Sequence, residues 1–309
     1  MGQTDSGVPE ERVLRETVHY CNRVYQRYSI DNELYWAPVD EEEIHRMQAL
    51  HLAINVALDG NLTIPVLGEP QRILDCGCGS ADWAIAAANK YPKCDVKAVD
   101  ICPQLLPNSV PSNLQLIIDD LNGRFTFRSS YFSFVHSQMV AEGISANRWE
   151  NYVRDIYRVL KPGGWCQLSE LYLNAQSDNG TLAADSALSR WSAGYLRGSQ
   201  LQKDPRIATK LGNLLKVAGF AEIKCQMFKM PMSAWSNDAR EQTIAQTSVN
   251  AIQSMLYSVG LYPFTRKQGL STVDFEQLVH DARDEAKDPA RKAYFSLYMW
   301  TARKPATAP

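Results

Sequence analysis

An apolar strand that runs through a glycine turn directly into a helix is the feature that most constrains this chain. Ile73 and Leu74 lack the alternation of a half-buried strand, as expected for a strand covered on both faces. Gly77 and Gly79 allow the backbone to turn tightly beneath a ligand, and Ser80 is a favourable N-cap for the next helix. The stretch is predicted to be a nucleotide-cofactor loop; the competing interpretation is an ordinary strand-to-helix turn.

The charges around this loop indicate which cofactor it binds. A dinucleotide-binding loop would have a third glycine three residues after Gly79, but Asp82 stands there, in the first turn of a helix that would face a pyrophosphate. Asp75 places a second carboxylate at the end of the strand. Two carboxylates suit a ligand that carries ammonium and sulfonium charges better than one that carries phosphates. The loop therefore predicts S-adenosylmethionine as the cofactor.

The composition excludes several classes of protein. The chain has 309 residues, of which 45% are hydrophobic and 21% charged, and its formal net charge is −2 without a dense Lys/Arg block, so no nucleic-acid partner is expected. No apolar run approaches the length of a membrane span, and no basic segment precedes an apolar one at the start, which predicts a cytoplasmic location. Gly2 and Ser6 fit the N-myristoylation pattern, but without a second signal no stable membrane anchor is expected.

The cysteines argue for reduced thiols and against a metal site. Their number is odd, and most fall inside apolar stretches: Cys21, Cys76, Cys78, Cys94, Cys102, Cys166 and Cys225. The close pair Cys76 and Cys78 has no companion pair and no nearby histidine cluster. The sequence therefore predicts no metal ligands.

Strands and helices alternate along the middle of the chain as in a doubly wound, Rossmann-like α/β sheet. We expect strands at 72–75, 95–99, 114–118, 132–136 and 164–173, with helices at 80–91 and 148–160. In such sheets ligands bind beyond the carboxyl ends of the strands. The polar residues expected at that edge are Asp75, Asp100, Asp120 and His136.

Helical segments are predicted on both sides of this core. The first begins at Pro9, with Leu14, Val18, Cys21, Tyr25 and Tyr28 on one face; the second begins at Asp40, in a capping box with Glu43, and ends before Asp59. The aromatic stretch between them contains Tyr28, Tyr35 and Trp36, which either line a substrate pocket or belong to the core.

The C-terminal half is predicted to contain helices at 182–201 and 207–218, a strand at 222–230, a long helix from Asp238, a short helix at 273–283 and a last strand at 293–302. Segment 231–289 is thus a helical insertion placed to cover the pocket, where Tyr257 either contacts substrate or packs in the core. The predicted division is 1–65, a helical lid and substrate segment; 66–230, the cofactor-binding core; 231–289, the lid insertion; and 290–309, the last strand and tail.

Several residues at the carboxyl edge have predicted roles toward the cofactor. Asp100 ends the second strand, where its carboxylate can accept hydrogen bonds from both ribose hydroxyls. Asp119 and Asp120 are adjacent, so only one can face the adenine amino group, and we choose Asp120, with the amide of Leu121 beside it. The predicted cofactor contacts are Asp75, Gly77, Gly79, Trp83, Asp100, Ile101, Asp119, Asp120, Leu121 and His136.

Taken in order, these residues resemble the LaeA-like methyltransferases of filamentous fungi. The resemblance covers nearly the whole chain after about residue 30. It is carried by the 38–51 block with Arg46 and His51, by the glycine loop with Trp83, by Asp100, by 111–113 and 119–120, by 160–164, and by Glu170, 218–220, Trp235 and 303–305. The Gly loop and the Lys-Pro-Gly-Gly turn are common to many class I methyltransferases, whereas the order of the motifs and the 38–51 block are more specific.

The resemblance implies a seven-stranded sheet whose last strand is antiparallel, S-adenosylmethionine as cofactor and a role in secondary metabolism. It also implies two kinds of protein: some members modify small natural products, and others regulate gene clusters with velvet-type partners. This chain departs from the family pattern in the glycine loop, at Gln138 where an arginine is usual, and at Phe125 or Phe127 where a tryptophan is usual. Because Gln138 and the phenylalanines lie at the predicted pocket rim, these changes leave the substrate open.

We therefore expect an S-adenosylmethionine-dependent methyltransferase that modifies oxygen, nitrogen or sulfur of a small secondary metabolite. His136 is the first candidate for a catalytic base and Glu142 the second; a cofactor-supporting role for His136 is the alternative. Substrate contacts are predicted for Tyr28, Tyr35, Trp36, Gln138 and Tyr257. The alternative function is a regulator that keeps the fold, binds a velvet-type partner and lies in the nucleus. A third possibility is a reaction other than methyl transfer, such as a cyclisation. A homodimer is also possible.

Overall fold

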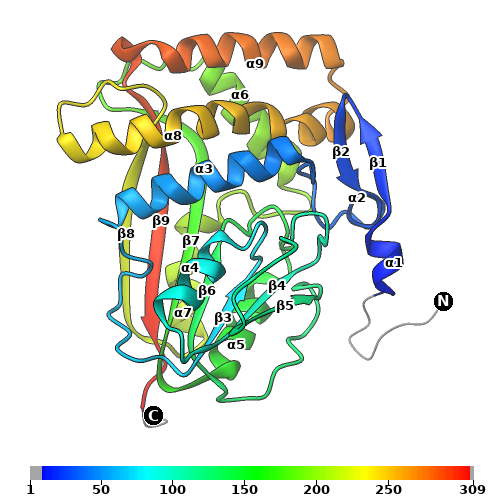
Figure 1. Cartoon of the computed structure of the whole chain (residues 1–309). Helices are drawn as coiled ribbons and strands as arrows, with labels where there is room; N and C mark the ends of the chain where they lie inside the picture. Colours follow the sequence, from blue (N-terminus) through cyan, green and yellow to red (C-terminus); the bar gives the residue numbers. More distant parts are fainter. Residues whose placement is uncertain (1–8, 307–309) are drawn as a thin grey trace.

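The computed structural model describes residues 9–306, so the myristoylation pattern at Gly2 and Ser6 lies outside the described residues. A seven-stranded sheet forms the centre of the molecule, in the order β5-β4-β3-β6-β7-β9-β8 (Figure 1). Its strands are β3 (Arg72–Cys76), β4 (Asp95–Asp100), β5 (Leu114–Ile118), β6 (Phe132–Gln138), β7 (Leu160–Ser177), β8 (Ala221–Pro231) and β9 (Ala293–Arg303).

The direction of the last strand confirms the predicted fold class. Strands β3 to β7 run parallel to one another, whereas β9 is inserted between β7 and β8 and is antiparallel to both. The chain is thus a Rossmann-like α/β protein with the seven-stranded sheet of class I methyltransferases. The central strands are covered on both faces, as their unbroken apolar runs predict.

Helices cover both faces of this sheet. One apolar cluster packs α4 (Asp82–Lys90) against β3 and β4, and another packs α5 (Trp149–Val159) and α7 (Leu211–Val217) against β6 and β7. The short turn η1 (Ile207–Thr209) precedes α7, so the predicted helix 207–218 is interrupted. These helices hold the strand ends that form the site.

A further group of helices lies beyond the carboxyl ends of the strands: α3 (Glu41–Ala57), α6 (Ala187–Ser199), α8 (Ala239–Ser258) and α9 (Thr272–Lys287) (Figure 1). The turn η2 (Pro263–Lys267) connects α8 to α9, and the turn η3 (Pro289–Arg291) connects α9 to β9. Helices α8 and α9 fall between β8 and β9, which is the predicted helical insertion. One apolar cluster joins all four helices to β7 and β9, so they form one core with the sheet. None of the helices among residues 9–306 combines the length and apolar character needed to cross a membrane.

The N-terminal segment differs from its prediction. Instead of one helix from Pro9, it forms α1 (Glu11–Leu14), a hairpin of β1 (Thr17–Tyr20) and β2 (Arg23–Gln26), and α2 (Arg27–Asp31). Cys21 and Asn22 both have positive φ, 48° and 60°, which is the backbone of a two-residue hairpin turn. The helical spacing of Leu14, Val18 and Tyr25 was misleading because β-branched and aromatic residues in 17–25 favour strands.

Helix α3 begins as predicted, but its capping box is incomplete. Asp40 accepts a hydrogen bond from the backbone amide of Glu43 at 3.1 Å. The Glu43 carboxylate does not return to Asp40; it lies fully buried and accepts hydrogen bonds from Arg46. A buried carboxylate is strongly stabilised by a guanidinium, so this pairing displaces the predicted cap.

Candidate functional site

A cavity of about 1380 Å³, its opening to solvent included, lies at the carboxyl ends of β3, β4, β5 and β6. Helices α3, α6 and α8 contribute its opposite wall. The predicted site residues that line it are Tyr35, Asp75, Gly77, Gly79, Trp83, Asp100, Ile101, Asp119, Asp120, Leu121, His136, Gln138 and Glu142.

The glycine loop forms the floor of this cavity. Gly77 and Gly79 have positive φ angles of 70° and 52°. A Cβ atom on Gly77 would lie 2.4 Å from Cγ1 of Val140, so this position needs glycine for both its backbone angle and its space. Ser80 is not the N-cap that the sequence predicted: Ala81, in the left-handed region, precedes α4, while the Ser80 hydroxyl donates to Asp82.

Asp100 fixes the loop from the neighbouring strand. Its Oδ2 accepts from the amide of Gly79 at 2.8 Å, and its Oδ1 accepts from the amide of Cys102 at 2.9 Å. Burial raises the pKa of Asp100, while these two amides oppose that change. Each carboxylate oxygen keeps a lone pair, so Asp100 can hold the loop and still accept from hydroxyl groups of a ligand.

The neighbouring acidic pair lies at the end of β5. Asp119 Oδ1 accepts from the amide of Asp120 at 2.9 Å, and Asp120 Oδ1 accepts from both the amide and the side chain of Asn122. Both carboxylates line the cavity beside Leu121. The structure therefore places the predicted adenine-binding residues together, without distinguishing Asp119 from Asp120 for this role.

His136 lies in a sealed position under the cavity. Its Nδ1 lies 2.8 Å from Oδ1 of Asp75, and its ring stacks on Trp83 at a centroid distance of 3.8 Å. His136 and Asp75 are 1% and 2% exposed, and the Nε2 atom of His136 has no partner. With Nδ1–H donating to Asp75, Nε2 is left as an acceptor.

A second group of carboxyls lies at the α6 side. Glu142 accepts from the hydroxyl of Tyr195 at 3.1 Å, and burial raises the pKa of Glu142 to about 7 against the opposing charge of Arg46. Glu170 accepts from the amides of Val140 and Ala141, and burial raises its pKa to about 8. Glu142 is therefore suited to accept or release a proton near neutral pH.

Three predicted substrate contacts do not line the cavity. Trp36 packs against Tyr262 at 5.6 Å between ring centroids, and Tyr257 packs against Phe275 at 5.5 Å. Tyr28 is half-buried and does not line the cavity. Burial raises the pKa of Tyr28, and the nearby charge of Asp120 raises it further. Trp36 and Tyr257 thus follow the core alternative, because Tyr262, at the start of η2, and Phe275, on α9, supply aromatic partners for them.

Helix α3 contributes lining residues to which the sequence assigned no role in the site. Arg46, Met47, Leu50 and His51 face the cavity, together with Glu170, Tyr195 and Met255 from other elements. The steps of three and four residues between Met47, Leu50 and Ile54 are typical of the buried face of a helix, but they do not indicate what that face meets. The polar residues Arg46 and His51 on the same helix were the feature of the sequence that could have indicated a ligand site there.

The chemistry of the lining fits a cationic nucleoside ligand. Seven carboxyl groups face the cavity, from Asp75, Asp82, Asp100, Asp119, Asp120, Glu142 and Glu170. The glycine turn leaves room for a ligand, and the partnerless Nε2 of His136 can accept from an ammonium group. Among residues 9–306 no cluster of three metal-ligating side chains is present.

Comparison with known proteins extends these observations. Residues 73–164 match a family described as a methyltransferase domain. The chain is 29% identical to the secondary metabolism regulator LAE1 of Cochliobolus heterostrophus, over 98% of this chain and 99% of that protein. It is 30% identical to the secondary metabolism regulator laeA of Aspergillus fumigatus, over 92% of this chain and 75% of that protein.

Another relative bears the name protein-methionine methyltransferase laeA, from Emericella nidulans; it is 29% identical over 88% of this chain and 73% of that protein. Among solved structures, an S-adenosylmethionine-dependent methyltransferase from Archaeoglobus fulgidus matches 86% of this chain and 100% of its own, with a TM-score of 0.50 and 12% identity. Phosphoethanolamine N-methyltransferase 2 of Haemonchus contortus matches 82% of this chain and 52% of its own, with a TM-score of 0.50 and 17% identity. These structures support the class I fold.

Proposed function

Because the chain belongs to the LaeA family of methyltransferase-domain proteins, whose cofactor is S-adenosylmethionine, we propose that it is a methyltransferase that controls secondary metabolism through protein partners. This replaces the tailoring of a small metabolite as the leading interpretation. The relatives it matches most fully are named regulators, and the likeness extends over nearly the whole chain. The name of the Emericella nidulans relative supports a protein side chain as one class of acceptor.

The observation that carries methyl transfer is the acid-lined cavity around the glycine loop. Carboxylates at the ends of β3, β4 and β5 suit a cofactor with a sulfonium centre, and Asp82 at the start of α4 disfavours a pyrophosphate. Since the cofactor carries an already activated methyl group, the chain must place the acceptor in line and exclude water. Helices α3, α6 and α8 cover the cavity and supply that exclusion.

The structure supports different roles for the two candidate bases, His136 and Glu142. His136 is held by Asp75 and stacked on Trp83 beneath the cavity, which supports a role in orienting the cofactor. Glu142, with a pKa of about 7, supports proton removal from a hydroxyl or ammonium acceptor. Gln138 and Tyr35 line the same cavity and are proposed to contact the acceptor.

A small-molecule acceptor is the second candidate, favoured by the apolar part of the cavity lining. Leu173, Met255 and Val259 line the same cavity as the hydrogen-bonded pair of Glu142 and Tyr195. Such a lining would hold an apolar group with one polar atom as well as it would hold a side chain.

Labelled cofactor separates the two candidates. The purified chain is incubated with methyl-labelled S-adenosylmethionine and native extract, and the products are separated by size. We expect the label in protein, and we expect a velvet-type or other partner to copurify with the chain. Label only in small molecules would favour the second candidate. The same preparation tests the proposed homodimer by sedimentation, and a fluorescent fusion tests a nuclear rather than cytoplasmic location.

A further inference from the structure

One cation faces the acidic cavity. Arg46 is the only lysine or arginine among the described residues that line it, opposite the seven carboxyl groups named above. Its side chain is 9% exposed, and its Nη1 atom is buried without a hydrogen-bond partner. A buried guanidinium nitrogen without a partner carries a large desolvation cost, so its place suggests that a ligand supplies the missing acceptor.

Glu43 determines which part of Arg46 is free. Both Glu43 oxygens accept from Nε of Arg46 at 3.0 Å, and Oε1 also accepts from Nη2 at 2.6 Å. Burial lowers the pKa of Arg46, but the adjacent Glu43 carboxylate outweighs it and raises the pKa above the usual range. Arg46 is thus a permanent cation whose other edge remains available.

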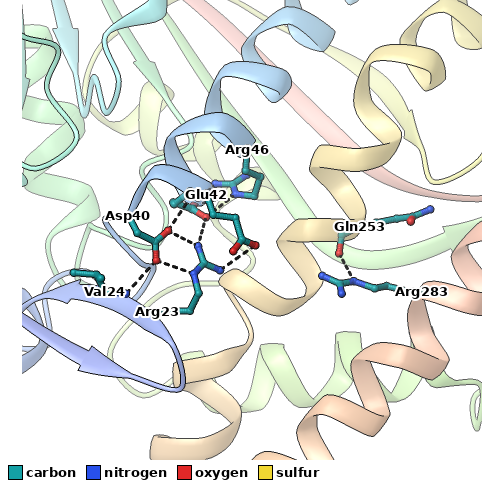
Figure 2. A network of polar contacts seen from close by, with 8 residues as sticks. Arg23, Val24, Asp40, Glu42, Arg46, Gln253 and Arg283 are labelled. Carbon is teal, nitrogen blue, oxygen red and sulfur yellow. Dashed lines mark hydrogen bonds and ion pairs between the residues drawn. The ribbon is translucent and has the colours of Figure 1, made fainter.

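A second arginine helps to hold Glu43 in place. Arg23, on the hairpin, pairs with Asp40 at 2.7 Å and reaches Glu43 at 3.9 Å (Figure 2). Figure 2 shows Arg46 on α3 beside this network, with Arg23 between Asp40 and Glu42. Because Glu43, the partner of Arg46, is itself contacted by Arg23 from β2, Arg46 is preorganised for a ligand.

We propose that Nη1 of Arg46 binds the carboxylate of the methionine moiety of S-adenosylmethionine. The inference rests on the cofactor of the proposed function. That cofactor has two cationic centres, which suit the acidic lining, and one carboxylate, which requires a donor of opposite charge. A guanidinium presents planar, charged donors that match a carboxylate.

Two other basic groups at or near the cavity, Lys203 and His51, fit this role less well. Lys203 already donates to the carbonyls of Leu34 and Gly143, at 2.7 and 3.3 Å, and burial lowers its pKa to about 8. His51 lines the cavity, but burial lowers its pKa, which keeps it neutral at pH 7. Neither offers the permanent positive charge of Arg46.

Calorimetry with two matched ligands tests the proposal. S-adenosylhomocysteine and its decarboxylated counterpart differ only by the carboxylate. The intact chain is expected to bind the first about tenfold or more tightly than the second. In Arg46→Gln this preference should fall below about threefold, through lost affinity for S-adenosylhomocysteine alone. Arg283→Gln, which removes a guanidinium bonded to the carbonyl of Gln253 away from the cavity, should keep the full preference.

Each other outcome overturns the assignment. Equal binding of the two ligands by the unmodified chain would refute it without any variant, as would an unchanged preference in Arg46→Gln. If Arg46→Gln does not fold, because Glu43 is left buried and charged, the double variant Glu43→Gln/Arg46→Gln replaces it under the same criterion. If the unmodified chain binds neither ligand, the cofactor assignment fails as well, which distinguishes failure of the proposed function from failure at Arg46 alone.

Discussion

His136 and Asp75 lie on adjacent parallel strands, with Nδ1 of the histidine 2.8 Å from Oδ1 of the aspartate, and both are sealed from solvent. Asp75 and His136 are register partners in the β3–β6 ladder, so their side chains project to the same face. The pair therefore forms a rigid base for the cofactor loop, which begins one residue after β3 ends.

Asp75→Asn should weaken this base. The side-chain amide disturbs the buried hydrogen bond to His136, so the free energy of unfolding is expected to fall by about 1.5–3 kcal/mol, as measured by denaturant titration. Asp95→Asn is the control, since its carboxylate lies at the other end of the strands with only a 3.5 Å contact to Tyr131, and should cost less than about 0.5 kcal/mol. Equal losses in both variants would contradict a special role for the pair.

Glu142 should make stability depend on pH. Burial raises its pKa from 4.5 to about 7 in the folded chain, so its folded form retains a proton that the unfolded chain has lost. Its contribution to stability is complete below about pH 4.5 and is lost as the pH rises through about 7. Relative to Glu142→Gln, the unmodified chain should therefore lose about 2 kcal/mol of unfolding free energy between pH 5 and 8.

Glu170 affects this comparison only through the charge of Glu142, because burial, the largest cause of its own raised pKa, is the same in both proteins. Parallel stability curves for the unmodified chain and Glu142→Gln across this pH range would show that Glu142 titrates normally.

Gly77→Ala tests the need for a bare backbone beneath the ligand. At Gly77 the new Cβ would meet Val140 at 2.4 Å with φ at 70°, so a loss of about 3 kcal/mol of unfolding free energy is expected, with loss of cofactor binding. Gly60 has a similar φ of 77° but nothing within 4 Å of the new atom, and Gly60→Ala should cost about 1 kcal/mol and leave binding unchanged. If the two substitutions lowered the free energy of unfolding by similar amounts, the backbone angle alone would account for the loss, and the contact with Val140 would not.

The cysteines of the loop are expected to be unreactive. Burial raises the pKa values of Cys76 and Cys78 well above that of a free thiol, whereas Cys225 is exposed on the edge strand β8. Peptide mapping after brief iodoacetamide treatment should find Cys225 modified about tenfold or more faster than the loop pair. Comparable labelling at Cys76, or a Cys76–Cys78 disulfide, would instead indicate a redox-sensitive loop.

The sheet and the cofactor side of the site were predictable because they depend on local signals. Unbroken apolar runs identified the strands, and one rule of parallel sheets placed Asp75, Asp100, Asp120 and His136 at a single edge. Even there, Ser80 lost its capping role because Ala81 adopted the left-handed conformation.

The acceptor side was less predictable because it is built from segments distant in sequence. Tyr195 bonds Glu142 across 53 positions, and Arg46 faces a cavity whose floor lies on other elements. Trp36 and Tyr257 are aromatic, as pocket residues often are, yet they pack against Tyr262 and Phe275 instead. Amphipathic spacing identifies a buried face, but not whether it meets a core or a ligand.

Calorimetric titration with S-adenosylhomocysteine tests the central claim most directly, that the acid-lined cavity over the glycine loop holds S-adenosylmethionine. We predict one site on the unmodified chain, and a loss of affinity of about tenfold or more in Asp100→Ala, whose carboxylate accepts from the amides of Gly79 and Cys102, while circular dichroism remains unchanged. Absence of binding to the unmodified chain, or undiminished affinity in a folded Asp100→Ala variant, would contradict the account.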